Sequence, residues 1–117
     1  METANYYTEN EEGKLHSKDD GPAVIIKRRG TYRHEWWNNG QLHRVGKPAI
    51  VHDQGWYGTY QAWYFEGQLH RTDGPATVEP SEWGDRVAWY INGTQMTKEE
   101  YCAAGYGEED FLVKGCK

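Results

Sequence analysis

The chain has 117 residues, of which 37% are hydrophobic and 15% aromatic, and its formal net charge is −5. This length fits one domain with a modest core, so a few large side chains must provide most of the burial. The negative charge argues against non-specific binding to nucleic acid or to an anionic membrane, and it suits a protein partner with a basic patch. No stretch has the ~18 consecutive apolar residues of a membrane-spanning helix.

The N-terminal segment, residues 1–12, is polar apart from Tyr6 and Tyr7. This pair is either a degenerate copy of an aromatic doublet that recurs further along the chain, or part of a frayed acidic terminus. The segment has no apolar run of the secretory type, so we expect a cytoplasmic protein with Cys102 and Cys116 reduced. A disulfide between these two cysteines is the alternative.

A unit of about 27 residues dominates the rest of the chain. Its fullest copy, residues 63–76, reads WYFEGQLHRTDGPA, and the copy before it begins at Trp36-Trp37. A third copy begins at Trp89-Tyr90 and is not completed. Strands are predicted over residues 22–28, 32–38, 48–53, 59–66, 75–79 and 86–91.

The turns and the end of the chain complete the predicted fold. Asn39-Gly40 favours a type I′ hairpin turn, because both of its central residues need a positive φ. Thr97 and Glu100 form a capping-box pattern at the start of a short helix that ends near Gly105. We therefore predict a mainly β protein, an antiparallel meander of about three hairpin repeats over residues 13–96, with a helical cap in residues 97–117. Residues 108–117 fit either a second helix or a strand.

Side-chain alternation along the long strands separates the aromatic residues into two faces. We expect the face with the first Trp of each copy to be the core; it comprises Trp36, Trp63, Trp89, Phe65, Val87 and Ile91. The opposite face carries Trp37, Tyr64 and Tyr90 beside Ala62 and Ala88, and its burial is left open. A two-residue turn places Trp37 opposite Leu42 and Tyr64 opposite Leu69.

Histidine follows leucine at His43 and His70 in the two full copies, and at His16 in a partial copy upstream, Gly13-Lys14-Leu15-His16. A histidine with Asp20 or Asp73 nearby can act as an acid, a base or a metal ligand. Because the residue recurs once per copy, we interpret it instead as a part of the repeat, for instance through a ring N–H bonded to a backbone carbonyl. No signature of a catalytic, metal-binding or cofactor-binding site is present.

Two loops outside the repeated pattern carry the candidate binding residues. Trp56 and Tyr57 lie in the loop 54–58, and Trp83 lies between Glu82 and Asp85 in the loop 80–85. Loops on a rigid scaffold commonly bind partners, and Trp and Tyr are favoured anchors at interfaces. The alternative is that these side chains fold back over the sheet. Tyr64 and Tyr90 are the second candidate surface.

A basic cluster, Lys27-Arg28-Arg29, precedes Tyr32 and Arg33. Such a cluster can stack on and neutralise nucleic acid. In an acidic chain we interpret it as a solvated hairpin tip, so nucleic acid is not an expected partner.

The repeated unit resembles MORN-like repeats, in the variant found in antitoxin-type repeat proteins and in small bacterial and phage proteins. The residues that match are Trp36-Trp37 with Asn39-Gly40, Trp63-Tyr64 with Gly67, and Trp89-Tyr90 with Asn92-Gly93. The segment L-H-R-x-D-G-P-A departs from the common MORN pattern. The resemblance implies successive β-hairpins and a binding or scaffolding role.

We therefore expect a non-catalytic module that binds another protein and blocks it. By analogy with the family, it is an inhibitor encoded by a phage or mobile element that acts on a bacterial defence or toxin protein in the host cytoplasm. Self-association through sheet edges is a further expectation. The alternatives are a protein that sequesters a nucleotide or sugar through Trp/Tyr faces and Arg44 or Arg71, and a hydrolase that uses His43 or His70.

Overall fold

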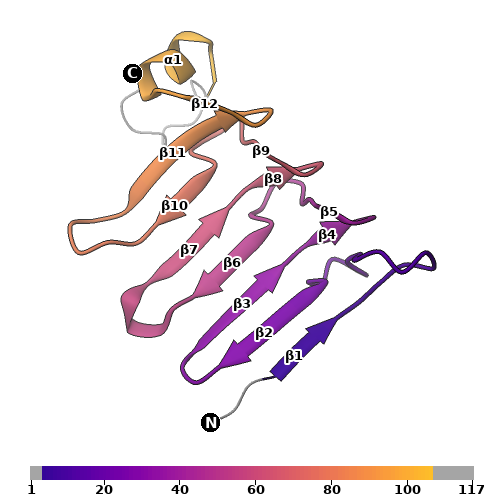
Figure 1. The fold of residues 1–117 in the computed structure, drawn as a ribbon. Helices are drawn as coiled ribbons and strands as arrows, with labels where there is room; N and C mark the ends of the chain where they lie inside the picture. The colour runs from indigo at the N-terminus through magenta and orange to yellow at the C-terminus, as the bar shows by residue number, and fades with distance from the viewer. Residues whose placement is uncertain (1–3, 107–117) are drawn as a thin grey trace.

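One antiparallel sheet of eight strands forms the body of the protein, which we describe from a computed structural model over residues 4–106. Strands adjacent in the sheet follow each other in sequence, as in a meander (Figure 1). In sheet order they are β1 (Ala4–Tyr7), β2 (Val24–Arg28), β3 (Thr31–Glu35), β6 (Ile50–Asp53), β7 (Thr59–Ala62), β10 (Thr77–Glu79), β11 (Arg86–Ile91) and β12 (Thr94–Met96). The predicted mainly β meander is confirmed.

Short hairpins extend two of the long strands beyond the sheet. β3 continues into β4 (Trp37–Asn38), which pairs with β5 (Gln41–Leu42), and β7 continues into β8 (Tyr64–Phe65), which pairs with β9 (Gln68–Leu69). The predicted pairs Trp37–Leu42 and Tyr64–Leu69 lie directly opposite each other. The predicted strands 32–38 and 59–66 are each interrupted at the Trp, whose backbone N–H turns to bond an alanine carbonyl of the next segment.

The repeat extends further toward the N-terminus than its sequence pattern does. The backbone N–H of Trp36 donates to the Ala49 carbonyl, that of Trp63 to Ala76, and that of Thr8 to Ala23. Thr8 therefore occupies the position of the first Trp. The predicted match between Tyr6-Tyr7 and Trp36-Trp37 is therefore wrong. The alternative of a frayed terminus is also wrong for Tyr6 and Tyr7, because both lie in β1 and pair with β2.

The hairpin turns have the backbone that their sequences predict. Asn39 and Gly40 have φ angles of 49° and 85°, Glu66 and Gly67 of 51° and 86°, and Asn92 and Gly93 of 50° and 83°. Positive φ at both central residues defines the type I′ turn, whose twist matches that of the flanking strands. Glu66 is the unfavourable residue of this set, because a side chain other than Asn or Gly clashes in the left-handed region.

Substituting Glu66→Asn should therefore stabilise the protein. Asn adopts a positive φ more readily than Glu and already occupies the same position in the neighbouring hairpins, so we expect a gain of about 0.5–1 kcal/mol in the free energy of unfolding. Chemical denaturation of both proteins measures the difference. The exposed Glu11→Asn, outside any helix or strand, serves as the control for the lost charge, and a gain of the same size there would contradict the explanation from backbone conformation.

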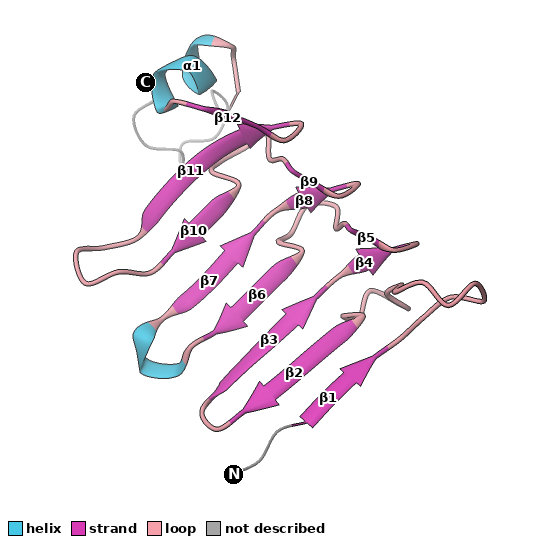
Figure 2. Cartoon of the chain, viewed as in Figure 1, coloured by secondary structure: helices cyan, strands magenta, loops and turns pink. Residues whose placement is uncertain are grey.

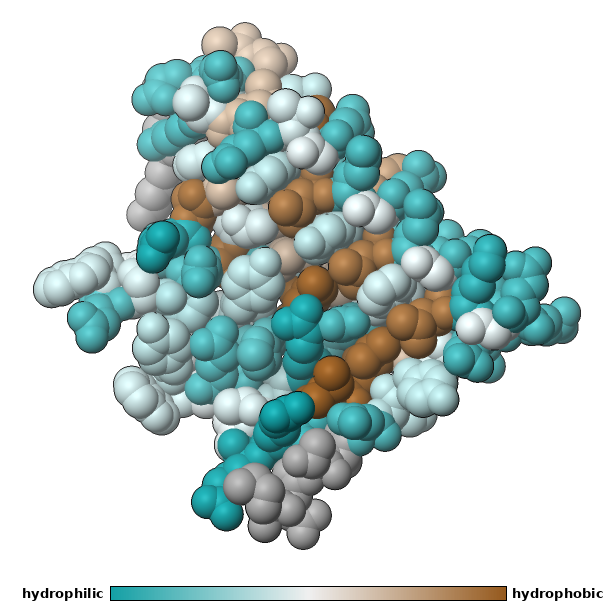
Figure 3. Space-filling view, in the orientation of Figure 1, coloured by the Kyte–Doolittle hydropathy of each residue, from teal (hydrophilic) through white to brown (hydrophobic). Residues whose placement is uncertain are grey.

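The sheet is a single layer, and burial is confined to a narrow line of residues. Among residues 4–106, the fully or nearly buried apolar residues are Ala23, Trp36, Ala49, Ile50, Ala62, Ala76 and Tyr101. Figure 3 shows bands of apolar side chains separated by polar ones on the face in view. Small residues predominate because the strands lie side by side and, within residues 4–106, no second layer accepts large side chains.

The prediction that the first-Trp face forms the core is wrong for most of its members. Only Trp36 is buried, at 8% exposure, while Phe65 and Val87 are about two-fifths exposed. Trp63, Trp89 and Ile91 are half-buried. The indoles are covered by cations instead of by a second sheet: the Arg44 guanidinium lies 3.7 Å from the ring centroid of Trp36, and that of Arg71 lies 3.8 Å from Trp63.

The short helix α1 (Lys98–Ala103) closes the far end of the sheet against β11 and β12. Its capping box is present as predicted: Thr97 Oγ1 accepts from the Glu100 N–H, and Glu100 Oε1 accepts from the Thr97 N–H. Within residues 4–106, no helix is long and apolar enough to cross a membrane. The predictions for residues 108–117 lie outside the described residues.

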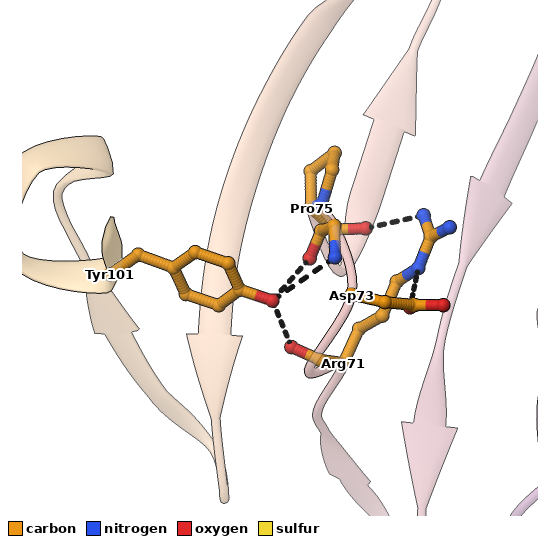
Figure 4. A network of polar contacts seen from close by, with 5 residues as sticks. Arg71, Asp73, Pro75 and Tyr101 are labelled. Atoms are coloured by element: carbon orange, nitrogen blue, oxygen red, sulfur yellow. Dashed lines mark hydrogen bonds and ion pairs between the residues drawn. The ribbon is translucent and has the colours of Figure 1, made fainter. Parts of the chain in front are cut away.

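Tyr101 on α1 joins the helix to the last complete repeat (Figure 4). Its ring contacts Trp89, with ring centroids 6.2 Å apart. In the other copies an arginine covers the equivalent Trp: Arg44 covers Trp36, and Arg71 covers Trp63. Its hydroxyl lies 2.6 Å from the Arg71 carbonyl oxygen and 2.9 Å from that of Gly74, and it accepts the Gly74 N–H at 3.1 Å.

Cys102, the residue after Tyr101, is bonded in a disulfide. The prediction that it is a reduced thiol is therefore wrong for this structure. The other cysteine of the sequence, Cys116, lies outside the described residues.

Candidate functional site

Three loops lie side by side at one end of the sheet, opposite the short hairpins (Figure 2). They connect β2 to β3, β6 to β7 and β10 to β11, and we call residues 28–31, 54–58 and 80–85 the loop row. The loops touch: a Cβ added at Gly55 would lie 2.9 Å from the Gly30 carbonyl oxygen, and one added at Gly58 would lie 2.7 Å from Pro80 Cβ. The loop row is therefore one continuous surface.

Trp56 is held in the solvent by an ordered turn in the middle of the loop row. It lies in the 3-10 helix η1 (Gly55–Tyr57), where Gly55 N–H donates to Asp53 Oδ1 and Gly58 N–H to the Gly55 carbonyl. The indole is 95% exposed, and Tyr57, which packs against its edge, is 49% exposed. The alternative that these side chains fold back over the sheet is wrong.

Trp83 is held out in the same way in the neighbouring loop. The backbone N–H of Trp83 donates to Ser81 Oγ, and the Ser81 hydroxyl donates to the Gly84 carbonyl. The Gly84 N–H in turn donates to the Ser81 carbonyl. The indole is 92% exposed, and Glu82 and Asp85 beside it are also exposed. Five of the predicted binding residues therefore lie together on the loop row: Trp56, Tyr57, Glu82, Trp83 and Asp85.

Tyr64 and Tyr90, the other two predicted binding residues, lie at the opposite end of the sheet. Both are half-buried, and their carbonyls accept the backbone N–H groups of Arg44 and Arg71. They neighbour Tyr60, whose pKa is raised by burial and, to a smaller extent, by Tyr64. The predicted site residues thus form two separate surfaces, and the two most exposed tryptophans, Trp56 and Trp83, lie on the loop row.

The sequence analysis missed the basic hairpin tip as a member of this surface. Arg28 and Arg29 are exposed, as predicted for a solvated tip. The next residue, Gly30, contacts the Trp56 loop through its carbonyl oxygen. The signal was present in the sequence, because Gly30, Tyr57 and Gly84 are spaced by 27 residues like the hairpin glycines. The repeat that aligns the hairpins also aligns the loops at the other end.

The repeated histidines bond the turn of the next copy. Nδ1 of His16 accepts the Asn39 N–H at 3.1 Å, Nδ1 of His43 accepts that of Glu66 at 2.9 Å, and Nδ1 of His70 accepts that of Asn92 at 2.9 Å. The predicted structural role is confirmed, but the suggested direction of the bond is wrong, since the ring nitrogen accepts. Only a neutral imidazole can accept, so each ring carries its proton on Nε2.

We expect His43→Gln and His70→Gln to lower the free energy of unfolding equally, by about 0.5–1.5 kcal/mol, the usual net value of one hydrogen bond. The two variants are matched, because both histidines make the same bond at the same position in neighbouring copies. Denaturation curves measure the loss. A folded His70→Gln protein that keeps partner binding but loses a measurable turnover would contradict the structural role and favour the hydrolase.

The stacked arginines bear on the ligand-sequestering alternative. Each donates from Nη1 to a proline carbonyl, Arg44 to Pro48 and Arg71 to Pro75. Arg71 Nε also lies 2.8 Å from Asp73 Oδ1, whereas Arg44 Nε is 3.9 Å from Asp20 Oδ1. One face of each indole is thus already covered by a guanidinium, so that face is closed to a nucleotide base or sugar. Arg71 Nε is bonded to Asp73, whereas Arg44 Nε is buried and makes no hydrogen bond.

Two histidines outside the repeat, His34 and His52, lie within the sheet. Burial lowers the pKa of His34, and nearby Lys27 lowers it further. Burial also lowers the pKa of His52, with Arg33 acting in the same direction and Asp53 opposing both. The neutral imidazole is therefore favoured at both positions. In residues 4–106, no group of three or more His, Cys, Asp or Glu side chains is placed to hold a metal ion.

Comparison of the chain with protein-family models, with curated proteins and with solved structures gives no match.

Proposed function

We propose that this chain is a non-catalytic module that binds another protein through the loop row. The proposal depends on Trp56 and Trp83, which are 95% and 92% exposed on adjacent ordered turns. Single exposed apolar residues are common, but these two tryptophans lie on adjacent loops, and Trp is a residue type that often dominates binding energy at interfaces. Because both turns are already ordered, binding costs little conformational entropy.

The charges beside Trp83 indicate the chemistry of the partner. Glu82 and Asp85 flank the indole, and both are exposed. An aromatic anchor beside carboxylates fits a basic patch with an apolar pocket at its centre, and the carboxylates would speed the approach of such a partner.

The biological setting is a proposal that depends on the resemblance to MORN-like repeats. On that ground we propose a small inhibitor, encoded by a phage or mobile element, that blocks a bacterial defence or toxin protein. The uses found for His16, His43 and His70 support a role without catalysis, because each ring nitrogen Nδ1 already accepts a backbone N–H.

Trp56→Ala and Trp83→Ala should each weaken partner binding by about 2 kcal/mol or more, the threshold for a hot spot. Affinity capture from a bacterial lysate, with the bound fraction analysed for proteins and for small molecules, supplies the partner for a binding titration. Both variants should keep their stability, because the indoles contact little of the chain. The variant Glu82→Lys/Asp85→Lys should mainly slow association and flatten its salt dependence.

Tyr64→Ala and Tyr90→Ala are the controls at the opposite end of the sheet. We expect their folded forms to bind with the affinity of the wild type. Unchanged affinity in both Trp variants, with a loss in the two Tyr variants, would move the binding surface to the hairpin end. Capture of a nucleotide or sugar without any protein would favour the ligand-sequestering alternative.

A further inference from the structure

The sign of the charge reverses along the loop row. At one end the β2–β3 tip carries Arg28 and Arg29, with no carboxylate in residues 28–31. At the other end the β10–β11 loop carries Glu82 and Asp85, and Arg86, the first residue of β11, lies opposite Glu79 of β10. Trp56 lies on the loop between them. The surface is therefore basic, aromatic and acidic in that order.

The sheet order places these groups at regular intervals. The three loops join β2–β3, β6–β7 and β10–β11, so successive loops are two strands apart in the order of the sheet (Figure 1). With neighbouring strands about 4.8 Å apart, successive loops are separated by about 10 Å and the charged ends by about 20 Å. The Trp56 loop lies midway between them.

We propose that the loop row pairs with the loop row of a second copy of this chain, antiparallel, about a two-fold axis near Trp56. In this arrangement Arg28 and Arg29 of each copy face Glu82 and Asp85 of the other. An interface of this kind is self-complementary, because a two-fold axis brings the same surface patch of both copies together. The inference depends on the loop row being an interaction surface, as in the proposed function.

Charge selects this arrangement over the other ways of pairing two rows. A parallel pairing would place arginines against arginines and carboxylates against carboxylates, which costs free energy. Each copy also has a net charge of −5, so contact at other acidic surfaces is repulsive and the attraction must be local. A row about 20 Å long is shorter than a standard interface, so we expect a weak dimer that a tighter partner displaces.

Charge reversal at each end gives a decisive experiment. Variant one carries Arg28→Glu and Arg29→Glu, and variant two carries Glu82→Lys and Asp85→Lys. Sedimentation equilibrium over the micromolar to millimolar range should show that the wild type forms dimers and that each variant alone stays monomeric. An equimolar mixture of the two variants should recover the dimer, because both contacts are then between opposite charges.

Two controls separate this pairing from general effects of charge and packing. Glu11→Lys/Glu12→Lys changes the net charge as much as variant two does, but on the exposed N-terminal hairpin, and it should dimerise at least as well as the wild type. Trp56→Ala removes the Trp56 indole of each copy near the two-fold axis. It should raise the dimer dissociation constant at least tenfold.

The outcomes also separate this inference from the proposed function. A wild type that stays monomeric throughout the range, dimers in either variant alone, or a mixture that fails to associate would each overturn the antiparallel pairing. A monomer whose binding to a captured protein requires Trp56 and Trp83 would overturn the self-pairing and leave the proposed function standing. A dimer rescued by mixing, with no loss of partner binding in the Trp variants, would overturn the proposed function alone.

Discussion

Replacing Tyr101 by alanine should lower the free energy of unfolding by about 3–5 kcal/mol, the range for truncating a buried aromatic side chain. Tyr101 is 0% exposed and is the largest fully buried side chain in residues 4–106. Its ring contacts Trp89 and Tyr106, and its hydroxyl bonds the loop between Arg71 and Gly74. The variant therefore loses apolar burial and the attachment of α1 to the repeat domain together.

Two milder variants separate these contributions. Tyr101→Phe keeps the ring and leaves the buried Gly74 N–H without its acceptor, which should cost about 1–3 kcal/mol. Thr97→Ala removes the N-cap and should cost about 1 kcal/mol without changing the Tyr101 contacts. Chemical denaturation followed by Trp fluorescence measures all three. A Tyr101→Ala protein no less stable than Thr97→Ala would contradict the role of Tyr101 as the anchor of the helix.

The second large effect is expected for Trp36→Ala, with a loss of about 3–5 kcal/mol. Trp36 is 8% exposed, its Nε1–H donates to the Asp20 carbonyl at 3.0 Å, and Arg44 covers its ring. Trp63 occupies the same position in the next copy but is half-buried, so Trp63→Ala should cost less than Trp36→Ala. Sequence alternation alone treats these two residues as equivalent.

Trp56→Ala is the matched control for the loss of an indole without the loss of burial. Because Trp56 is 95% exposed, its truncation should change the free energy of unfolding by no more than about 0.5 kcal/mol. Thermal melts of the three Trp variants test the order Trp36, Trp63, Trp56. If Trp56→Ala proves the most destabilising, the burial described for these residues is wrong.

The sequence by itself determined the local structure of this protein. Asn39-Gly40 and Asn92-Gly93 specify type I′ turns, because only a few residue types tolerate positive φ at both central positions. Thr97 and Glu100 specify the helix start through hydrogen bonds that span three residues. The 27-residue spacing specified sequential hairpins, since equivalent segments adopt equivalent structures. Each of these features depends on interactions between residues close in sequence.

The tertiary structure alone decided which side chains are buried. Trp36, Trp63 and Trp89 alternate identically along their strands, yet only Trp36 is buried. Burial depends on what packs around each ring: Arg44 covers Trp36, Arg71 covers Trp63, and Tyr101 of the helix contacts Trp89. Trp36 also reaches the Asp20 carbonyl through Nε1–H.

For the candidate site, the sequence identified the residues and the structure showed how they are arranged. The sequence identified Trp56 and Trp83 as unusual, because neither belongs to the repeated pattern. Only the tertiary structure showed that their loops touch each other and that the Trp56 loop touches the basic tip at Gly30. It also placed Tyr64 and Tyr90 at the other end of the sheet. Residues about 27 positions apart become neighbours only when antiparallel strands pair, and that pairing brings Arg28 and Arg29 into line with Glu82 and Asp85.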